Sequence, residues 1–124
     1  MNTKNSEYLP IGLINIPKKI LFVCTGNMDR SPTAEDLLEG REEFEAMSAG
    51  TSMYARRRNS ESLLGWADQI FVMEIEHEAA ILHLMPDVEK KIIVLDLPNN
   101  CLRNDPELVR MLKAKLSKHL NIKW

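Results

Sequence analysis

The chain has 124 residues, of which 44% are hydrophobic and 27% are charged, proportions typical of one globular domain with a proper core. Its formal net charge is −2, so the chain has no excess of basic residues that would indicate binding to nucleic acid or to a membrane surface. Two cysteines are too few for a disulfide framework or a four-ligand zinc site. No apolar run is long enough to span a membrane, so we expect a soluble, cytoplasmic protein. We also expect that it uses no cofactor.

The first 17 residues are largely polar and are interrupted by Pro10 and Pro17, which indicates a loosely attached N-terminal extension. From residue 18 to residue 124, strand-like and helix-like segments alternate, a pattern typical of one α/β domain. Strands are predicted at 19–23, 44–48, 69–73 and 91–95, and helices at 32–39, 60–67, 76–84 and from the N-cap Asp105 onward. The continuously apolar strands predict a parallel sheet that helices cover on both faces.

The segment between the first strand and the first helix carries the strongest functional pattern, Cys24-Thr25-Gly26-Asn27-Met28-Asp29-Arg30-Ser31. A strand, a tight loop and a helix N-terminus in this order form an anion cradle, because the loop N–H groups and the helix dipole converge. Such a cradle favours the thiolate of Cys24, its nucleophilic form. Arg30 can bind two phosphate oxygens there. The structural alternative is a buried strand-end thiol beside a surface arginine.

This segment, continued through Pro32-Thr33-Ala34-Glu35, resembles the signature of the low molecular weight protein tyrosine phosphatases. Residues 47–51 and 70–74 resemble the second and third strands of that family. The resemblance runs from about residue 19 to the C-terminal helix, and with it we expect a three-layer α/β fold whose four parallel strands have the order 2-1-3-4. It implies a protein phosphatase that hydrolyses a phosphate monoester through a phosphocysteine intermediate. Phosphotyrosine or a related aryl phosphate, on a protein or a small molecule, is the implied substrate.

The resemblance also assigns the residues around the phosphate. Ser31 occupies the position of a family serine that donates a hydrogen bond to the thiolate, and it also fits the N-cap ahead of Pro32. Asn27 either braces the loop, as in the family, or is a left-handed turn residue. The expected phosphate contacts from the loop are Thr25, Gly26, Asn27, Met28, Asp29 and Ser31.

The run Arg56-Arg57-Arg58 precedes a predicted helix, where positive charge is unfavourable with the helix dipole. One interpretation is a rim that attracts anionic substrates, with Arg57 as the contact. The other is a solvated basic loop. Tyr54, just before this run, is expected to form an apolar wall of the cleft.

The leaving oxygen needs a proton donor, which in the family is the aspartate of an Asp-Pro pair after the fourth strand. Asp96 directly follows that strand here, one residue away from the family spacing, whereas Asp105-Pro106 keeps the dipeptide but reads as a helix start. In a parallel sheet, ligands bind at the edge formed by the carboxyl ends of the strands. Asp96 is expected at that edge, which favours it as the general acid. The segment Asn99-Asn100-Cys101 replaces the aromatic pair that the family carries beyond its acid.

Asp29 stands where many relatives carry a cysteine that pairs with the nucleophile, and we expect its carboxylate to face away from the phosphate. Cys101 is then either a resolving thiol or a bystander. Two other functions share the cradle: an arsenate reductase, whose thioredoxin-coupled forms need two further cysteines, and a non-catalytic phosphate- or phosphoprotein-binding module, which would not need Asp96. No partner role for nucleic acid or membrane is expected.

Overall fold

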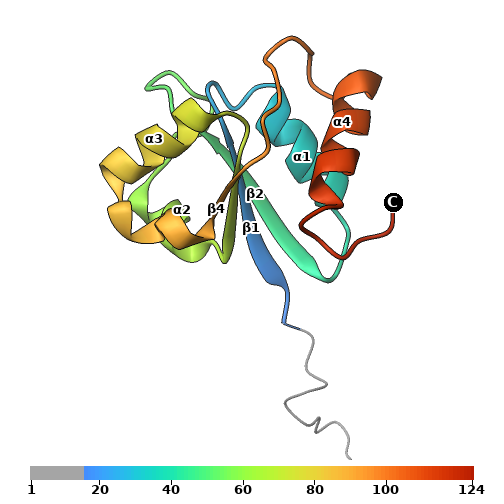
Figure 1. Ribbon diagram of the computed structural model, residues 1–124, viewed down its shortest axis with the longest axis horizontal. Coiled ribbons are helices and arrows are strands. Elements are labelled where there is room, and N and C mark those ends of the chain that lie inside the picture. The colour runs from blue at the N-terminus through green and yellow to red at the C-terminus, as the bar shows by residue number, and fades with distance from the viewer. Residues whose placement is uncertain (1–15) are drawn as a thin grey trace, which may run out of the picture.

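The computed structural model describes residues 16–124. Its elements are β1 (Lys18–Cys24), α1 (Arg30–Leu38), β2 (Phe44–Gly50), α2 (Glu61–Trp66), β3 (Gln69–Val72), α3 (Ile75–Leu84), the 3₁₀ helix η2 (Pro86–Lys91), β4 (Ile92–Val94) and α4 (Pro106–Leu116). All four strands are parallel, in the order β2-β1-β3-β4 (Figure 1). The predicted fold class and strand order are confirmed. The predicted extension, 1–17, lies almost wholly outside the described residues.

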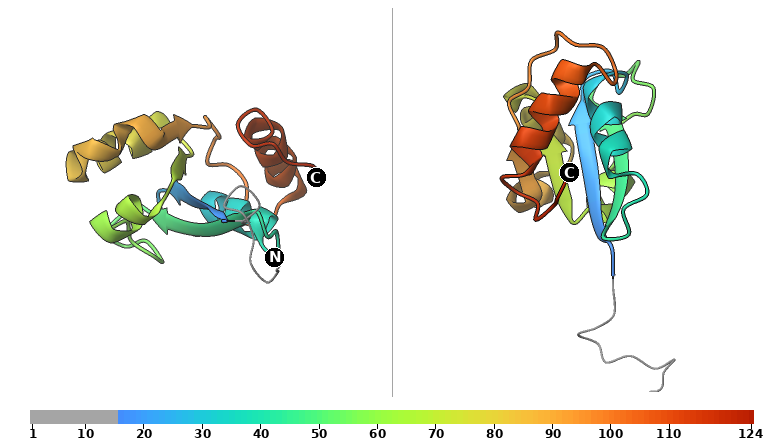
Figure 2. Two further views of the ribbon diagram at one scale, coloured as in Figure 1. Left: turned by 90° about the horizontal axis from the view of Figure 1, so that it is seen from below. Right: turned by 90° about the vertical axis from the view of Figure 1, so that its right-hand side faces the viewer.

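Helices cover both faces of the sheet, as the continuously apolar strands predict. Helices α1 and α4 lie on one face and α2 and α3 on the other (Figures 1 and 2). Side chains of β1 alternate between the two resulting cores: Phe22 and Cys24 belong to the core with α4, whereas Leu21 and Val23 belong to the core with α3. Burial on both faces explains why this strand has no polar position after Lys19.

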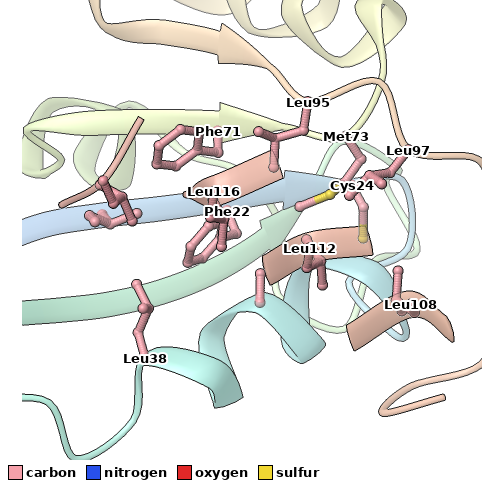
Figure 3. Close-up of a cluster of buried hydrophobic side chains, with 13 residues drawn as sticks. Phe22, Cys24, Leu38, Phe71, Met73, Leu95, Leu97, Leu108, Leu112 and Leu116 are labelled. Atoms are coloured by element: carbon pink, nitrogen blue, oxygen red, sulfur yellow. The ribbon is translucent and has the colours of Figure 1, made fainter. Parts of the chain in front are cut away.

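The core beneath α1 and α4 reaches the end of β1. Phe22 and Phe71 stack with their ring centroids 5.6 Å apart. The leucines of α4 at 108, 112 and 116 belong to the same cluster, with Leu116 nearest to Phe22 (Figure 3). Cys24, only 3% exposed, closes this cluster at the sheet edge where β1 enters its loop. The nucleophile candidate is therefore anchored by packed strand and helix rather than by a free loop.

Two local predictions were wrong. Helix α1 begins at Arg30 rather than at residue 32, because the N–H and the hydroxyl of Thr33 both donate to the carbonyl of Asp29. Asp29, not Ser31, is therefore its N-cap. Lys91, expected as the first residue of the fourth strand, is instead the last residue of a 3₁₀ helix over residues 86–91. Pro86 lies in the first turn of that helix, where a missing N–H is tolerated. Within residues 16–124, no helix is both long and apolar enough to cross a membrane.

Candidate active site

The loop after β1, residues 25–29, lies against the loop that follows β2. The N–H groups of Thr51, Ser52 and Arg56 donate to the carbonyls of residues 24, 25 and 26 at 3.0, 3.0 and 3.1 Å. The Nε of Arg56 donates to the next carbonyl, that of Asn27, at 3.0 Å. Four consecutive carbonyls thus point to the same neighbouring loop, which leaves the N–H groups to face the other way.

Those N–H groups remain unused by the protein. Within the described residues, no hydrogen bond is donated by a backbone N–H of residues 25–29. Four of these five residues line a cavity of about 220 Å³, whose wall consists of Cys24, Thr25, Gly26, Met28, Asp29, Arg30 and Asn99. The cavity lies at the N-terminus of α1, whose dipole adds positive potential. Unpaired N–H groups that converge at a helix start bind anions.

Polar side chains brace this loop from below. The Oγ of Ser31 lies 2.9 Å from the Sγ of Cys24. Asn27, fully buried with φ of 55°, donates from Nδ2 to Ser31 at 3.0 Å and to Ser48 of β2 at 2.9 Å. Asn27 thus has the left-handed backbone of a turn residue and also makes two side-chain hydrogen bonds beneath the loop. Neither Asn27 nor Ser31 lines the cavity, so both hold the loop and the sulfur from behind.

Arg30 is buried, with 2% of its surface exposed, yet it lines the cavity. Its Nη1 donates to Oε1 of Glu74 at 2.7 Å and to the carbonyl of Leu97 at 2.8 Å. This fixes one corner of the guanidinium. Within residues 16–124, the N–H groups of Nε and Nη2 have no protein acceptor, so they could bind a bidentate ligand. Glu74, at the N-cap of α3, had no signal in the sequence pattern as a partner of the loop arginine.

A second contact from α3 reaches the loop. The N–H of Glu74 donates to Nδ1 of His77 at 3.0 Å, so the ring proton sits on Nε2. That nitrogen lies 2.8 Å from the Oγ1 of Thr25 and donates to it. Burial, and then the positive charge of Arg30, lower the pKa of His77 from 6.5 to about 4, against the opposing effect of Glu74. A neutral His77 therefore orients the Thr25 hydroxyl at the cavity.

Neither predicted acid lines the cavity. Asp96 is exposed between Leu95 and Leu97, which are both buried in the α4 core, and its φ is 59°. Asp105 caps α4 by accepting the N–H of Glu107 at 2.8 Å. The residue of this loop that lines the cavity is Asn99.

Asp29 and Arg103 join the loop after β4 to the loop after β1. The carboxylate of Asp29 accepts the N–H of Arg103 at 2.9 Å. The Arg103 guanidinium binds Asp36 of α1 with contacts of 2.9 to 3.1 Å, and the N–H of Asn104 donates to Thr33 at 2.9 Å. The Asp29 side chain is thus directed to the neighbouring loop, although the residue also lines the cavity.

The other predicted contacts lie away from the cavity. Tyr54 is 87% exposed and is not part of the cavity wall. Arg57 is half-buried and donates from Nη1 to the carbonyl of Ser48 at 3.3 Å, so its guanidinium points back to β2 rather than to a substrate rim. Its neighbour Arg56 makes the contact with the phosphate loop. The basic run alone gave no means of telling the two apart.

Cys101 is a free thiol in the loop after β4 and packs against the α4 core. Burial, together with the negative charges of Asp105 and Glu107, raises the pKa of its thiol. A thiol with a raised pKa forms less thiolate and is a poorer resolving nucleophile. These surroundings suit a bystander cysteine.

Comparisons with known proteins agree with this geometry. The family model for low molecular weight phosphotyrosine protein phosphatase matches residues 19–64. A protein-arginine-phosphatase from Geobacillus stearothermophilus is 31% identical over 104 residues, which cover 64% of this chain and 70% of that protein.

Two solved structures share the fold. The arginine phosphatase YwlE from Geobacillus stearothermophilus superimposes with a TM-score of 0.63 at 24% identity, covering 85% of this chain and 94% of that one. The tyrosine phosphatase Wzb from Escherichia coli K30, solved with phosphate, has a TM-score of 0.68 at 21% identity, with 83% and 96% covered.

Proposed function

Since the chain belongs to the low molecular weight phosphotyrosine protein phosphatase family, we propose that it hydrolyses phosphate monoesters through a phosphocysteine intermediate. One observation carries the proposal: Cys24 and Arg30 line a cavity around which the N–H groups of residues 25–29 are unpaired. A nucleophile, a cation and preorganised donors are the parts that phosphoryl transfer needs.

In the first step, the Sγ of Cys24 attacks phosphorus and the bond to the leaving group breaks. Arg30 and the loop amides stabilise the charge on the phosphoryl oxygens. In the second step, water attacks the phosphocysteine, and the electron pair of the P–S bond returns to sulfur. Ser31, 2.9 Å from that sulfur, supports it by hydrogen bonding. Both steps use residues of this chain and no metal.

The family and its relatives suggest two substrate classes. An aryl phosphate such as phosphotyrosine follows from the family. Phosphoarginine is the second candidate, because the 31% identical relative is a protein-arginine-phosphatase. Turnover of a phosphotyrosine peptide and a phosphoarginine peptide of the same sequence, compared by kcat/KM, separates the two.

The mechanism is tested with Cys24→Ser and, as a matched control, Cys101→Ser. We expect Cys24→Ser to abolish release of p-nitrophenol from p-nitrophenyl phosphate while the protein still binds inorganic phosphate. Cys101→Ser should keep wild-type turnover, and a chelator should have no effect. Rapid acid quenching should trap a phosphorylated Cys24, identified by mass spectrometry. Turnover that survives in Cys24→Ser would exclude the cysteine mechanism.

A further inference from the structure

Asn99 is held at the cavity by contacts on both sides of it along the chain. Two residues before it, Leu97 donates its N–H to the carbonyl of Met73 and accepts from Arg30, both at 2.8 Å. Four residues after it, Arg103 is bound to Asp29 and Asp36. A segment anchored to the catalytic arginine at one end and to the phosphate loop at the other has little freedom. Its position in the cavity wall is therefore built into the fold.

The two aspartates predicted as candidate acids lie outside the cavity wall. Packing of Leu95 and Leu97 in the core turns the intervening Asp96 to solvent, and Asp105 is committed to the cap of α4. Among the residues described, Asp29 is the one carboxylate in the cavity wall, and its Oδ1 already accepts the Arg103 N–H. The residue that the loop after β4 presents to the cavity is an amide.

We propose that the Asn99 amide faces the leaving group, and that the enzyme therefore selects phosphate compounds whose leaving group departs as a stable anion. This rests on the proposed function. An amide donates a hydrogen bond to the leaving oxygen but transfers no proton. When Cys24 attacks phosphorus, the P–O bond breaks and its electron pair stays on the leaving oxygen. Any proton that oxygen takes up comes from water, after departure.

The natural substrate class that meets this requirement is an acyl phosphate, the mixed anhydride of a carboxylic acid and phosphate. Its leaving carboxylate has a conjugate acid of pKa near 4, compared with about 10 for the phenol of tyrosine. The guanidine nitrogen that would leave from phosphoarginine is more basic still and needs a proton. General acid catalysis is typically worth ~10²–10⁴ in rate, and most for basic leaving groups. The rate of acyl phosphate hydrolysis does not depend on a general acid. Hydrolysis of phosphotyrosine or phosphoarginine without one is slower by most of this rate factor.

The test uses acetyl phosphate, p-nitrophenyl phosphate and phenyl phosphate as probes, compared by kcat/KM, which reports the steps through departure of the leaving group. The key variant is Asn99→Asp, which places a carboxylic acid at the cavity. Asn100→Asp is the matched control, since it adds the same group one residue later, at an exposed position outside the cavity wall. Assays run at mildly acidic pH, where the introduced carboxyl is partly protonated.

We expect Asn99→Asp to raise kcat/KM for phenyl phosphate by ~10²-fold or more, while acetyl phosphate and p-nitrophenyl phosphate stay within about threefold. Asn100→Asp should change none of them. Asp29→Asn and Asp96→Asn should leave the ratio of p-nitrophenyl to phenyl phosphate at its wild-type value.

Three results would overturn the inference and leave the proposed function standing. One is a wild-type enzyme that hydrolyses phenyl phosphate nearly as well as p-nitrophenyl phosphate. The second is an Asn99→Asp variant that gains nothing on phenyl phosphate. The third is a selective loss on phenyl phosphate in Asp29→Asn or Asp96→Asn, which would identify that residue as the acid. A wild-type protein that binds phosphate but hydrolyses none of the probes would instead overturn the proposed function, and this inference with it.

Discussion

The Oγ of Ser31 lies 2.9 Å from the Sγ of Cys24, closer than its other acceptor, the carbonyl of Ala49 at 3.4 Å. Because Ser31 already accepts a hydrogen bond from Asn27, its own proton is free to point at the sulfur. Hydrogen bonds to charged groups contribute about 1.5–3 kcal/mol. In the mechanism that we propose, this contact would stabilise the sulfur of Cys24 both as nucleophile and as leaving group.

Ser31→Ala should consequently lower kcat for p-nitrophenyl phosphate by ~10–10²-fold, since the sulfur must leave when the phosphocysteine is hydrolysed. Stopped-flow measurement should show a burst of p-nitrophenol followed by a slower steady state. Ser117→Ala is the control, because that hydroxyl bonds only within the C-terminal region, to Lys113 and Trp124. A Ser31→Ala variant with wild-type kcat would remove Ser31 from the mechanism.

Arg30→Lys should reduce kcat/KM by ~10²–10³. Lysine keeps the charge but loses the planar guanidinium, which uses Nη1 for Glu74 and Leu97 and leaves its other nitrogens to the cavity. An ammonium group cannot satisfy both sets of partners at once. Near-native kinetics in this variant would show that the phosphate does not contact Arg30.

Glu74→Gln tests the ion pair between Arg30 and Glu74 by changing the acidic partner. The amide preserves the shape but removes the charge that holds Nη1 at 2.7 Å, so we expect a smaller loss of kcat/KM than in Arg30→Lys. Arg110→Lys is the control, because Arg110 pairs with Glu107 on the exposed face of α4. An equal loss in the control would point to a general effect on stability.

The fold was predictable because β1 and β4 contain continuous apolar runs and because α4 has a recognisable start. The Asp105 cap of α4 and the Ser60 cap of α2 are both observed. The loop after β1 was also predictable as a pattern, since Cys24 to Ser31 are eight adjacent residues. Contacts between residues far apart in sequence could not be predicted. An example is the contact between Thr25 and His77, which are 52 residues apart.

The direction of Asp96 shows what pattern reasoning missed. Its place at the end of β4 favoured the cavity, but Leu95 and Leu97 on either side are both core residues. Asp96 itself has φ of 59°, in the left-handed region, so the chain turns between two leucines that are both buried, and the Asp96 side chain is left exposed. The expectation rested on the end of the strand, which does not reveal such a local turn. Arg56 and Arg57 contact different segments, the loop after β1 and β2 respectively. Two adjacent arginines in the sequence do not indicate which of them makes which contact.

Gly50→Ala should destabilise the fold and abolish activity. A Cβ at this position would clash with the carbonyl oxygen of Thr25 and lie 2.6 Å from the Cβ of Ala55 and 3.0 Å from the N of Asn27. The two loops of the site meet here, so relief of the clash requires them to separate. We expect a loss of about 2–4 kcal/mol in the free energy of unfolding, measured by urea denaturation.

Gly65→Ala is the matched control, since a Cβ there meets nothing within 4 Å and Gly65 lies inside α2. Alanine at this helical position should stabilise the protein by up to about 1 kcal/mol and leave turnover unchanged. If both variants behaved alike, the close approach of the two loops would have no energetic role.

His77 should make the stability of the fold depend on pH. Its pKa in the folded protein is about 4, against 6.5 ordinarily. Between these values the unfolded chain binds a proton that the folded protein does not, so stability falls as pH drops from 6.5 to 4 and is fully retained above 6.5. Protonation would also remove the acceptor that Nδ1 offers to the Glu74 N–H.

Because carboxylates titrate in the same range, the effect is measured as a difference between variants. His77→Gln should flatten the plot of unfolding free energy against pH between 4 and 6.5 by on the order of 1–3 kcal/mol in total. His83→Gln, an exposed histidine of the same helix, should keep the wild-type slope. If wild type and His77→Gln gave parallel curves, His77 would not carry the linkage; a wild type that gained stability on acidification relative to His77→Gln would mean that its pKa is raised rather than lowered.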